Sequence, residues 1–366
     1  MRKYFVLFGI FWFLTCGYAQ KTFIPATHKA INIIGRYDIT SSDEIRYDWP
    51  NTTIRFRFTG TEVELAIKGG ERNYFNLFIN DSLHSIWHQP QDSVLNVKGL
   101  DPLEIHELRL QKRTEGEMGM VLFKGIYLPD GEELMIVKKE SGRKIEFIGN
   151  SITCGYGVEG ETRHEKFQPS TENVNKSYAL IASRALNADS HVIAHSGLGV
   201  VRNYGDNSKV SLGRRTMPQR FNQTFDSEST LAWDFSLWKP DVVVVNLGTN
   251  DYSTKPHPEK PIFQSVYISL LDNIYDKYGN IPVFLICGPL IDEPAYTNIK
   301  EIVSKTIEDK PNANLYFIGI PKALLNSTTN LGSDSHPSYS GQLKIANHIL
   351  PTIATVMHWN YVVEKQ

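Results

Sequence analysis

The sequence predicts an α/β protein in which a β-sandwich of jelly-roll type precedes a flavodoxin-like three-layer α/β/α domain. Two observations lead to this fold class. Up to about residue 135, short apolar segments with a period of two are separated by Gly, Asn and Asp turns. From about residue 142, nearly pure apolar segments alternate with segments of helical spacing, which is typical of a parallel sheet covered on both faces.

The first residues differ from the rest of the chain. Arg2 and Lys3 precede an apolar run over residues 4–14, and small residues follow at Gly17 and Ala19. This pattern predicts a secretory signal peptide over residues 1–19, so we expect an exported protein in the periplasm or outside the cell. The run is too short for a transmembrane helix, and bulky residues before Cys16 disfavour a lipid anchor there.

The next region, residues 22–135, reads as the all-β domain. Apolar side chains alternate with polar ones in short segments, which lie at 54–58, 63–67, 75–79, 108–110 and 121–127. Regular short strands with turns between them favour a β-sandwich or jelly roll. A charged connector, residues 132–142, then leads into the second domain.

The second domain is expected over residues 142–362. We expect its strands at 144–150, 191–194, 241–248, 281–287 and 315–320, and its helices at 177–186, 263–278, 299–307 and 342–357. Five parallel strands separated by helices indicate the sheet order 2-1-3-4-5, with a functional site at the carboxyl ends of the strands.

The first of these strands runs into Ser151, within the string GNSITCGYG. A small residue before a serine allows a sharp turn that lifts the hydroxyl from the sheet edge and leaves main-chain N–H groups free for an oxyanion. Ser151 is therefore a candidate nucleophile for acyl transfer. The alternative is a serine that only caps a helix.

The second and third strands end in residues that can donate to an oxyanion. Gly197, in HSGLG, exposes its main-chain N–H without a side chain in the way. Asn250, in GTND, can direct its side-chain amide over the sheet edge. Taken alone, each is also explained by an ordinary turn.

The last loop contains Asp334 and His336, in the string SDSHP. In extended backbone, residues two apart point the same way, and Pro337 favours extended structure before it. We therefore expect Asp334 to orient the His336 imidazole. Ser151, Gly197, Asn250 and His336 would follow strands one, two, three and five, so one sheet edge collects all four.

The strings GNSIT, SGLG, GTND and DSHP resemble the four conserved blocks of the SGNH (GDSL) hydrolase superfamily. The longer strings GNSITCGYG and SGLGVVRNYGD, the Asp-x-His-Pro end and the β-rich first domain are similar to carbohydrate esterase family two. Members of that family remove acetyl groups from plant polysaccharides and carry an N-terminal jelly roll. The resemblance covers nearly all of the chain after the predicted signal peptide.

The resemblance implies roles for the candidate residues. Ser151 would be the nucleophile and His336 the general base, with Asp334 at the acidic position. The Ser151 N–H, the Gly197 N–H and the Asn250 amide would form the oxyanion hole. Some members orient the histidine through a main-chain carbonyl instead, so the role of Asp334 stays open.

Two positions depart from the family pattern. Asn150 stands where the first block has Asp, which removes a negative charge beside the nucleophile. Ser335 stands where an aromatic residue, typically Trp, is expected to line the substrate cleft. Stacking of a sugar at that point is therefore in doubt.

The leading hypothesis is an exported serine esterase that removes O-acetyl groups from a plant-type polysaccharide or oligosaccharide through an acyl-enzyme. One alternative is a GDSL-type lipase or aryl esterase, and another is an inactive carbohydrate-binding protein. Four aromatic residues are cleft candidates, although core packing is the more common role for such residues: Tyr204, Trp233, Trp238 and Tyr252.

The composition of the chain limits the classes of binding partner and cofactor that we expect. The net charge of −2 over 366 residues gives no reason to expect nucleic acid or an anionic membrane as a partner. Cys154 and Cys287 would lie near the ends of strands two places apart, about 9–10 Å from each other, too far for a disulfide. We expect two free, buried thiols, no metal site and no organic cofactor.

Overall fold

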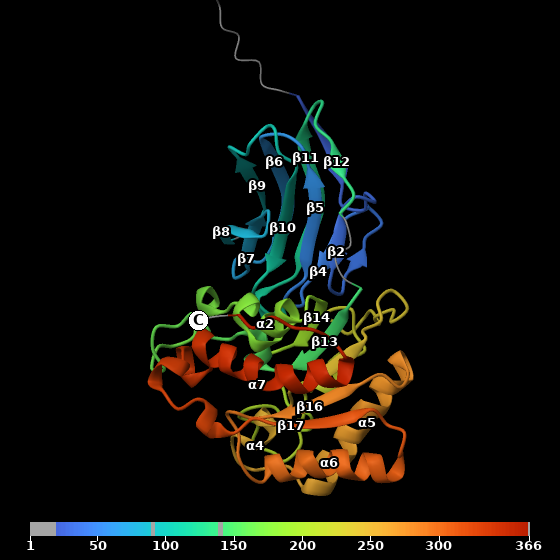
Figure 1. Ribbon diagram of the computed structural model, residues 1–366, viewed down its shortest axis with the longest axis vertical. Helices are drawn as coiled ribbons and strands as arrows, with labels where there is room; N and C mark the ends of the chain where they lie inside the picture. Colours follow the sequence, from blue (N-terminus) through green and yellow to red (C-terminus); the bar gives the residue numbers. More distant parts are fainter. Residues whose placement is uncertain (1–19, 89–91, 138–141, 365–366) are drawn as a thin grey trace, which may run out of the picture.

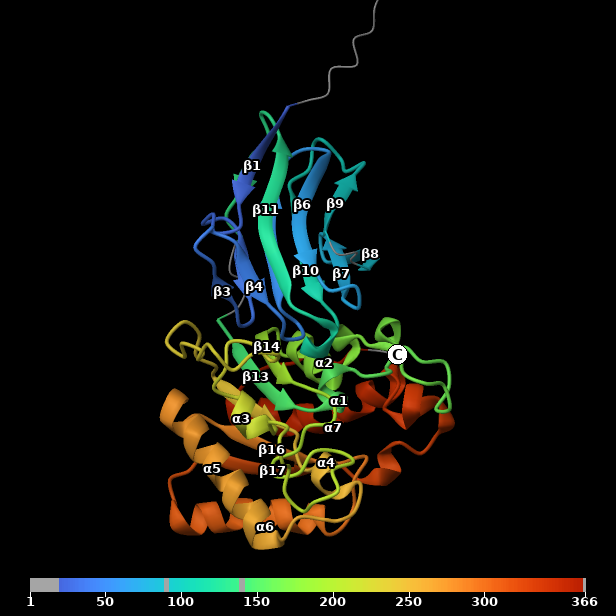
Figure 2. The same ribbon diagram turned by 180° about the vertical axis from the view of Figure 1, so that it is seen from behind.

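The computed structural model of the chain describes residues 20–364 apart from residues 89–91 and 138–141. It consists of a β-rich body resting on an α/β body (Figures 1 and 2). The predicted signal peptide over residues 1–19, with Cys16, lies outside the described residues, as does part of the 132–142 connector.

The β-rich body is built from two antiparallel sheets. The first sheet has the order β3 (Asp38–Ile39), β4 (Ile45–Tyr47), β11 (Val121–Pro129), β6 (Glu62–Gly69), β9 (Asp92–Lys98), with β1 (Lys21–Pro25) also on β11. The second has the order β12 (Leu134–Met135), β5 (Thr53–Phe58), β10 (His106–Lys112), β7 (Tyr74–Ile79), β8 (Ser82–His88), with β2 (Asn32–Ile34) also on β5. Alternate residues such as Phe56, Phe58, Val63 and Leu65 are buried in one core, so the prediction of an all-β region is confirmed.

The α/β body contains a five-stranded parallel sheet in the order β14-β13-β15-β16-β17. Its strands are β13 (Lys144–Gly149), β14 (Asp189–Ala194), β15 (Val242–Val245), β16 (Val283–Cys287) and β17 (Leu315–Gly319). This order is the predicted 2-1-3-4-5, since β13 is the first strand of this sheet along the chain. Alternate residues of β15 face opposite sides: Val243 and Val245 lie in one apolar core, and Val242 and Val244 in the other.

Helices cover both faces of this sheet, which confirms the three-layer prediction (Figure 1). The helices α5 (Lys260–Tyr278) and α6 (Ala295–Asp309) cover one face, and α2 (Tyr178–Ala185) and α7 (Tyr339–Met357) cover the other. Single-turn helices occupy the loops: α1 (Ser151–Cys154), α3 (Met217–Arg220) and α4 (Thr249–Tyr252). The 3₁₀ turns are η1 (Gly116–Met118), η2 (Pro169–Thr171), η3 (Val174–Lys176), η4 (Lys322–Leu324), η5 (Thr328–Asn330) and η6 (Ser333–Ser335).

The two bodies are joined by buried polar contacts. Arg36 of the β-rich body forms a fully buried ion pair with Glu146 of β13, with 3.1 Å between Nη2 and Oε1. The Trp49 indole N–H donates to the Thr224 carbonyl at 3.0 Å. Because an unpaired buried charge is strongly destabilising, separating the bodies would leave Glu146 in an unfavourable state.

Cys154 and Cys287 are both free and buried, as predicted. The chain outside the masked positions contains no helix with the length and apolar character needed to cross a membrane.

Candidate active site

The side chains picked out by the sequence follow the carboxyl ends of the parallel strands. Ser151 comes two residues after β13, Gly197 three residues after β14, and Asn250 lies in α4 beyond β15. His336 lies between β17 and α7. Neighbouring parallel strands end at the same edge of a sheet, so four separate stretches of chain converge there.

Ser151 and His336 are in direct contact. The His336 Nε2 atom lies 2.9 Å from the Ser151 Oγ atom, which is a hydrogen-bond distance. The Asn150 side chain, not that of Ser151, caps α1 by accepting a hydrogen bond from the Ile152 N–H at 3.1 Å. The alternative in which Ser151 only caps a helix is therefore wrong, and its hydroxyl is free to bond His336.

His336 is poised to accept a proton. Burial lowers the pKa of His336 to about 4, although the main-chain carbonyl and charge of Asp334 oppose the shift. A neutral imidazole at ordinary pH can take the proton of a neighbouring hydroxyl. The pair thus has the chemistry of an activated serine.

Gly197 lies in a loop, residues 195–203, that we call the Gly197 loop. The φ of Gly197, +78°, belongs to the left-handed region that glycine adopts without strain. A Cβ at this position would meet only the Tyr204 Cβ atom, at 3.9 Å, so the space beside Gly197 is open. The Tyr204 N–H donates to the Gly197 carbonyl at 2.8 Å.

Two neighbouring residues in α4 hold this loop. The Asn250 amide donates through Nδ2 to the Leu198 carbonyl at 2.8 Å, which leaves its second N–H available. The Asp251 carboxylate accepts hydrogen bonds from three successive main-chain N–H groups, at residues 200, 201 and 202. Burial raises the pKa of Asp251 to about 6 against these three donors.

Sequence reasoning missed Asp251. The signal was its place directly after Asn250, in the block GTND. Nothing in the spacing indicates that a carboxylate there turns back to the previous loop, because that contact joins residues about 50 positions apart.

Asp334 does not have the predicted contact with His336. His336 itself is extended, as predicted, but the expectation of extended backbone is wrong for Asp334 and Ser335, whose φ values of 49° and 61° belong to a 3₁₀ turn. The turn directs the Asp334 carboxylate to the Phe167 N–H at 3.1 Å, the Lys166 ammonium at 3.1 Å and the Tyr156 hydroxyl at 3.4 Å. The buried His336 Nδ1 atom has no hydrogen-bond partner of good geometry among the described residues.

An aromatic pair lies beside His336. The Tyr156 and Phe167 rings are stacked, with centroids 3.8 Å apart and planes 13° apart. The Tyr156 ring centroid is 4.4 Å from that of His336. Both are only partly buried, so this pair offers an apolar surface next to His336 that the sequence analysis did not identify.

The four aromatic cleft candidates separate clearly. Trp233 and Tyr252 are buried, and Trp238 stacks on His191 with ring centroids 3.6 Å apart, so these three pack within the protein. Tyr204 is 57% exposed and adjoins Gly197, so it is the candidate that faces solvent beside the site.

A charged cluster supports the start of the Gly197 loop. The His195 Nδ1 atom lies 2.5 Å from the Asp226 carboxylate, which also bonds Arg220. Burial opposes protonation, but Asp226 raises the pKa of His195 to about 9. The His195 imidazolium thus forms an ion pair with a buried carboxylate, and its role is structural.

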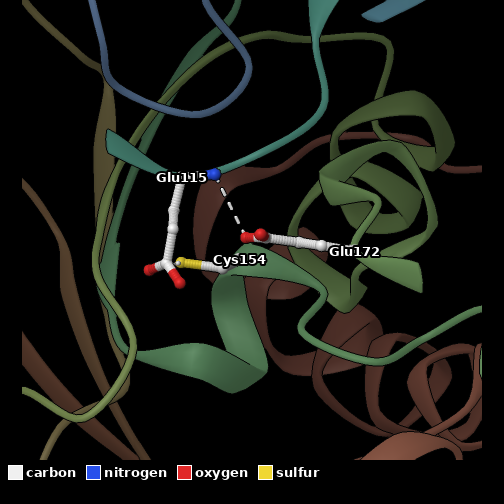
Figure 3. Close-up of side chains that lie close together, drawn as sticks. All are labelled: Glu115, Cys154 and Glu172. Carbon is white, nitrogen blue, oxygen red and sulfur yellow. Dashed lines mark hydrogen bonds between the residues drawn. The ribbon is translucent and has the colours of Figure 1, made fainter. Parts of the chain in front are cut away.

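A second cluster contains residue types that bind metals. Potential ligand atoms of Glu115, Cys154 and Glu172 all lie within 4.8 Å of one another and are buried (Figure 3). Lys112 and Arg113 act electrostatically on Glu172, so the buried carboxylates already have positive neighbours. Burial and Glu115 also raise the pKa of the Cys154 thiol, and a protonated thiol is a poor ligand. These three side chains are therefore better suited to hydrogen bonding within the protein than to binding a metal ion.

Comparison with family models gives two matches. Residues 33–137 match the carbohydrate esterase 2 N-terminal region, and residues 147–362 match the GDSL-like lipase/acylhydrolase family.

Two curated relatives are each about one-third identical to the chain. The cellulase/esterase CelE of Acetivibrio thermocellus is 33% identical over 330 residues, which cover 89% of this chain and 39% of that protein. An acetylxylan esterase / glucomannan deacetylase of Cellvibrio japonicus is 32% identical over 213 residues, which cover 57% of this chain and 56% of that protein. The chain thus spans about 40% and somewhat over half of the lengths of these relatives.

Solved structures show the same two-part architecture. A family two carbohydrate esterase from Clostridium thermocellum in complex with cellohexaose has a TM-score of 0.83 and 32% identity, covering 90% of this chain and 99% of that one. A family two carbohydrate esterase from Cellvibrio japonicus has a TM-score of 0.82 at 17% identity, covering 93% and 99%, which demonstrates a shared fold.

Proposed function

Because this chain belongs to the GDSL-like lipase/acylhydrolase family and, within it, to the family two carbohydrate esterases, we propose that it removes O-acetyl groups from a polysaccharide or oligosaccharide. The observation that carries the proposal is the 2.9 Å contact between the Ser151 hydroxyl and a neutral His336. The relatives named as acetylxylan esterase and glucomannan deacetylase support acetylated carbohydrate as the substrate class.

The reaction proceeds in two stages. Ser151 Oγ attacks the acetyl carbonyl carbon while His336 Nε2 takes the hydroxyl proton, and the sugar oxygen then leaves with that proton. Water next attacks the acetyl-serine carbonyl and gives a proton to His336, which returns it to Ser151 as acetic acid departs and then ionises to acetate in solvent. No metal or organic cofactor is required for either stage.

The negative oxygen of each tetrahedral intermediate is stabilised by the Ser151 N–H, the Gly197 N–H and the free N–H of the Asn250 amide. The open space beside Gly197 and the anchored loop support this assignment. Donors that are already in place do not need to reorganise as charge develops. Asp334 acts differently from the triad expectation, since its carboxylate holds the Tyr156 and Phe167 segment against His336.

The sugar approaches between partly exposed aromatic side chains. The stacked Tyr156 and Phe167 rings lie beside His336, and the exposed Tyr204 lies beside Gly197. Aromatic rings stack on the apolar faces of sugars, so this arrangement replaces the aromatic residue missing at Ser335.

The test is acetate release from acetylated xylan, glucomannan and pectin by the parent protein and by Ser151→Ala. The parent should release acetate from at least one polymer, and the variant should not, with an unchanged thermal midpoint as the folding control. A parent that hydrolyses long-chain p-nitrophenyl esters faster than the acetate would indicate the lipase alternative. Polymer binding without any acetate release would indicate the inactive binding protein.

The organisation of the chain is part of the proposal. We place the signal peptide at residues 1–19, the jelly-roll domain at 22–135 and the hydrolase domain at 142–362, and we propose export to the periplasm or cell exterior. Mass spectrometry of the protein secreted by its host should find an amino terminus at Gln20. A terminus at Met1 in the mature protein would contradict both the cleavage site and export by this route.

A further inference from the structure

We propose that Glu115, a residue of the β-rich body, is a positioning residue that fixes the Gly197 loop against the helix that carries Ser151. The inference rests on the proposed function and deepens it, because it makes the jelly-roll domain a contributor to the oxyanion hole. The Glu115 carboxylate joins three separate segments of the chain: its own, the Gly197 loop and α1.

One carboxylate oxygen of Glu115 reaches both catalytic segments. Its Oε2 atom accepts a hydrogen bond from the Ser196 N–H at 2.5 Å, and Ser196 directly precedes Gly197. The same oxygen accepts from the Cys154 thiol at 3.5 Å, and Cys154 is the last residue of α1, which begins at Ser151. Glu115 thus links the two segments that supply the proposed main-chain donors.

The position of Glu115 is itself fixed (Figure 3). The residue is 1% exposed, its N–H donates to Glu172 Oε1 at 3.1 Å, and its carbonyl accepts from the Lys112 ammonium at 2.8 Å. Gly116 follows in close contact with the hydrolase domain, since a Cβ there would lie 2.3 Å from Asp226 Oδ2. The segment therefore cannot shift without disturbing both bodies.

Burial of the Glu115 carboxylate costs free energy of folding, which indicates that its contact with the Gly197 loop has a specific role. Burying a carboxylate is unfavourable, whereas an exposed loop N–H is satisfied by water at little cost. A charge-assisted hydrogen bond is shorter and stronger than a neutral one, so it restricts the peptide more tightly. Oxyanion donors must lie within a few tenths of an ångström of their target, so such restriction acts on the transition state.

The chain offers a matched control at the same interface. The Asn51 amide donates to the Ser190 carbonyl at 2.7 Å, which is also a buried contact between the two bodies. Ser190 lies at the amino end of β14, whereas Gly197 follows its carboxyl end. Asn51 has a φ of +66°, so Asn51→Gly removes the side chain without straining the backbone.

The experiment measures kcat and KM on p-nitrophenyl acetate, the thermal midpoint, and inhibition by phenylboronic acid. Glu115→Ala should lower kcat about tenfold to a hundredfold with KM within twofold, less than deletion of a donor itself. Its inhibition constant for the boronate, whose tetrahedral adduct uses the same donors, should rise in step. Asn51→Gly should lower the thermal midpoint and leave kcat and the inhibition constant unchanged.

Two conservative variants keep the proposal testable if Glu115→Ala does not fold. Glu115→Gln retains an acceptor oxygen at the same reach but only as a neutral, weaker acceptor, so it should keep part of kcat. Glu115→Asp withdraws the carboxylate from Ser196 and should keep less. Equal or reversed kcat values for these two would overturn the proposal, as would unchanged kcat in a folded Glu115→Ala. A parent without esterase activity, or activity that survives Ser151→Ala, would overturn the proposed function instead.

Discussion

The Gly197 loop and the turn before His336 both follow the carboxyl ends of strands in the parallel sheet, but different groups hold them. The loop is fixed by side chains: the Asp251 carboxylate, the Asn250 amide and the Glu115 carboxylate all bond its main chain. The turn is fixed by its own backbone, since the N–H groups of residues 333, 334 and 335 donate to carbonyls at 157, 165 and 163.

The difference follows from what each segment supplies. In the proposed mechanism the Gly197 loop offers main-chain N–H groups, so the backbone itself must be held in place, and side-chain acceptors do this. The turn offers the His336 side chain, and a rigid main-chain turn sets its position even though no described residue gives His336 Nδ1 a hydrogen bond of good geometry. Substitutions on the two sides should therefore have different consequences.

The largest effect is expected for His336→Ala. Removing the base that contacts Ser151 should lower kcat by about 10⁶, as loss of a serine nucleophile does. The measurement is the hydrolysis rate of p-nitrophenyl acetate, with circular dichroism as the folding control. A loss below tenfold would show that another group accepts the Ser151 proton.

Asn250→Ala should come next. The change removes a proposed oxyanion donor together with the hydrogen bond to the Leu198 carbonyl, so we expect kcat to fall about 10²–10³-fold. KM should change little, because the donor acts on charge that develops only in the transition state. A rise in KM at unchanged kcat would assign Asn250 to substrate binding.

The pH dependence of kcat/KM tests the environment of His336. Because the pKa of His336 is lowered to about 4, the imidazole stays neutral down to that pH, and kcat/KM should fall only as the pH drops through about 4. At pH 5 the activity should exceed that expected for an unperturbed histidine by about 30-fold. An acid limb near pH 6.5, with fluorescence showing a folded protein, would contradict the buried environment of His336.

Asp334→Asn should have the smallest effect on kcat, below about tenfold. The carboxylate does not bond His336, and asparagine tolerates the left-handed backbone at this position. Weaker contacts to Lys166 and to the Phe167 segment should instead raise KM for oligosaccharides. A loss of about 10⁴ in kcat, as for an essential triad aspartate, would show that Asp334 orients His336 after all.

Local sequence patterns were sufficient for the fold and for the placement of the candidate site residues after the strands of the parallel sheet. Apolar runs with a period of two predicted the antiparallel strands, and purely apolar runs such as 242–245 predicted buried parallel strands. These patterns depend on burial of one or both faces of a strand, which nearby residues encode. The strand order then placed Ser151, Gly197, Asn250 and His336 at one edge, and the structure has the Ser151–His336 contact there.

The tertiary structure decided which polar side chains support that edge. Asp334 lies two residues from His336 yet turns away, because left-handed residues make a tight turn where the sequence indicated extended backbone. Asp251 and Glu115 reach the Gly197 loop from positions about 50 and 80 residues away, so no local spacing reveals them. Hydrogen-bond partners of buried carboxylates depend on which segments the completed fold brings together, whereas periodicity depends only on neighbours in the chain.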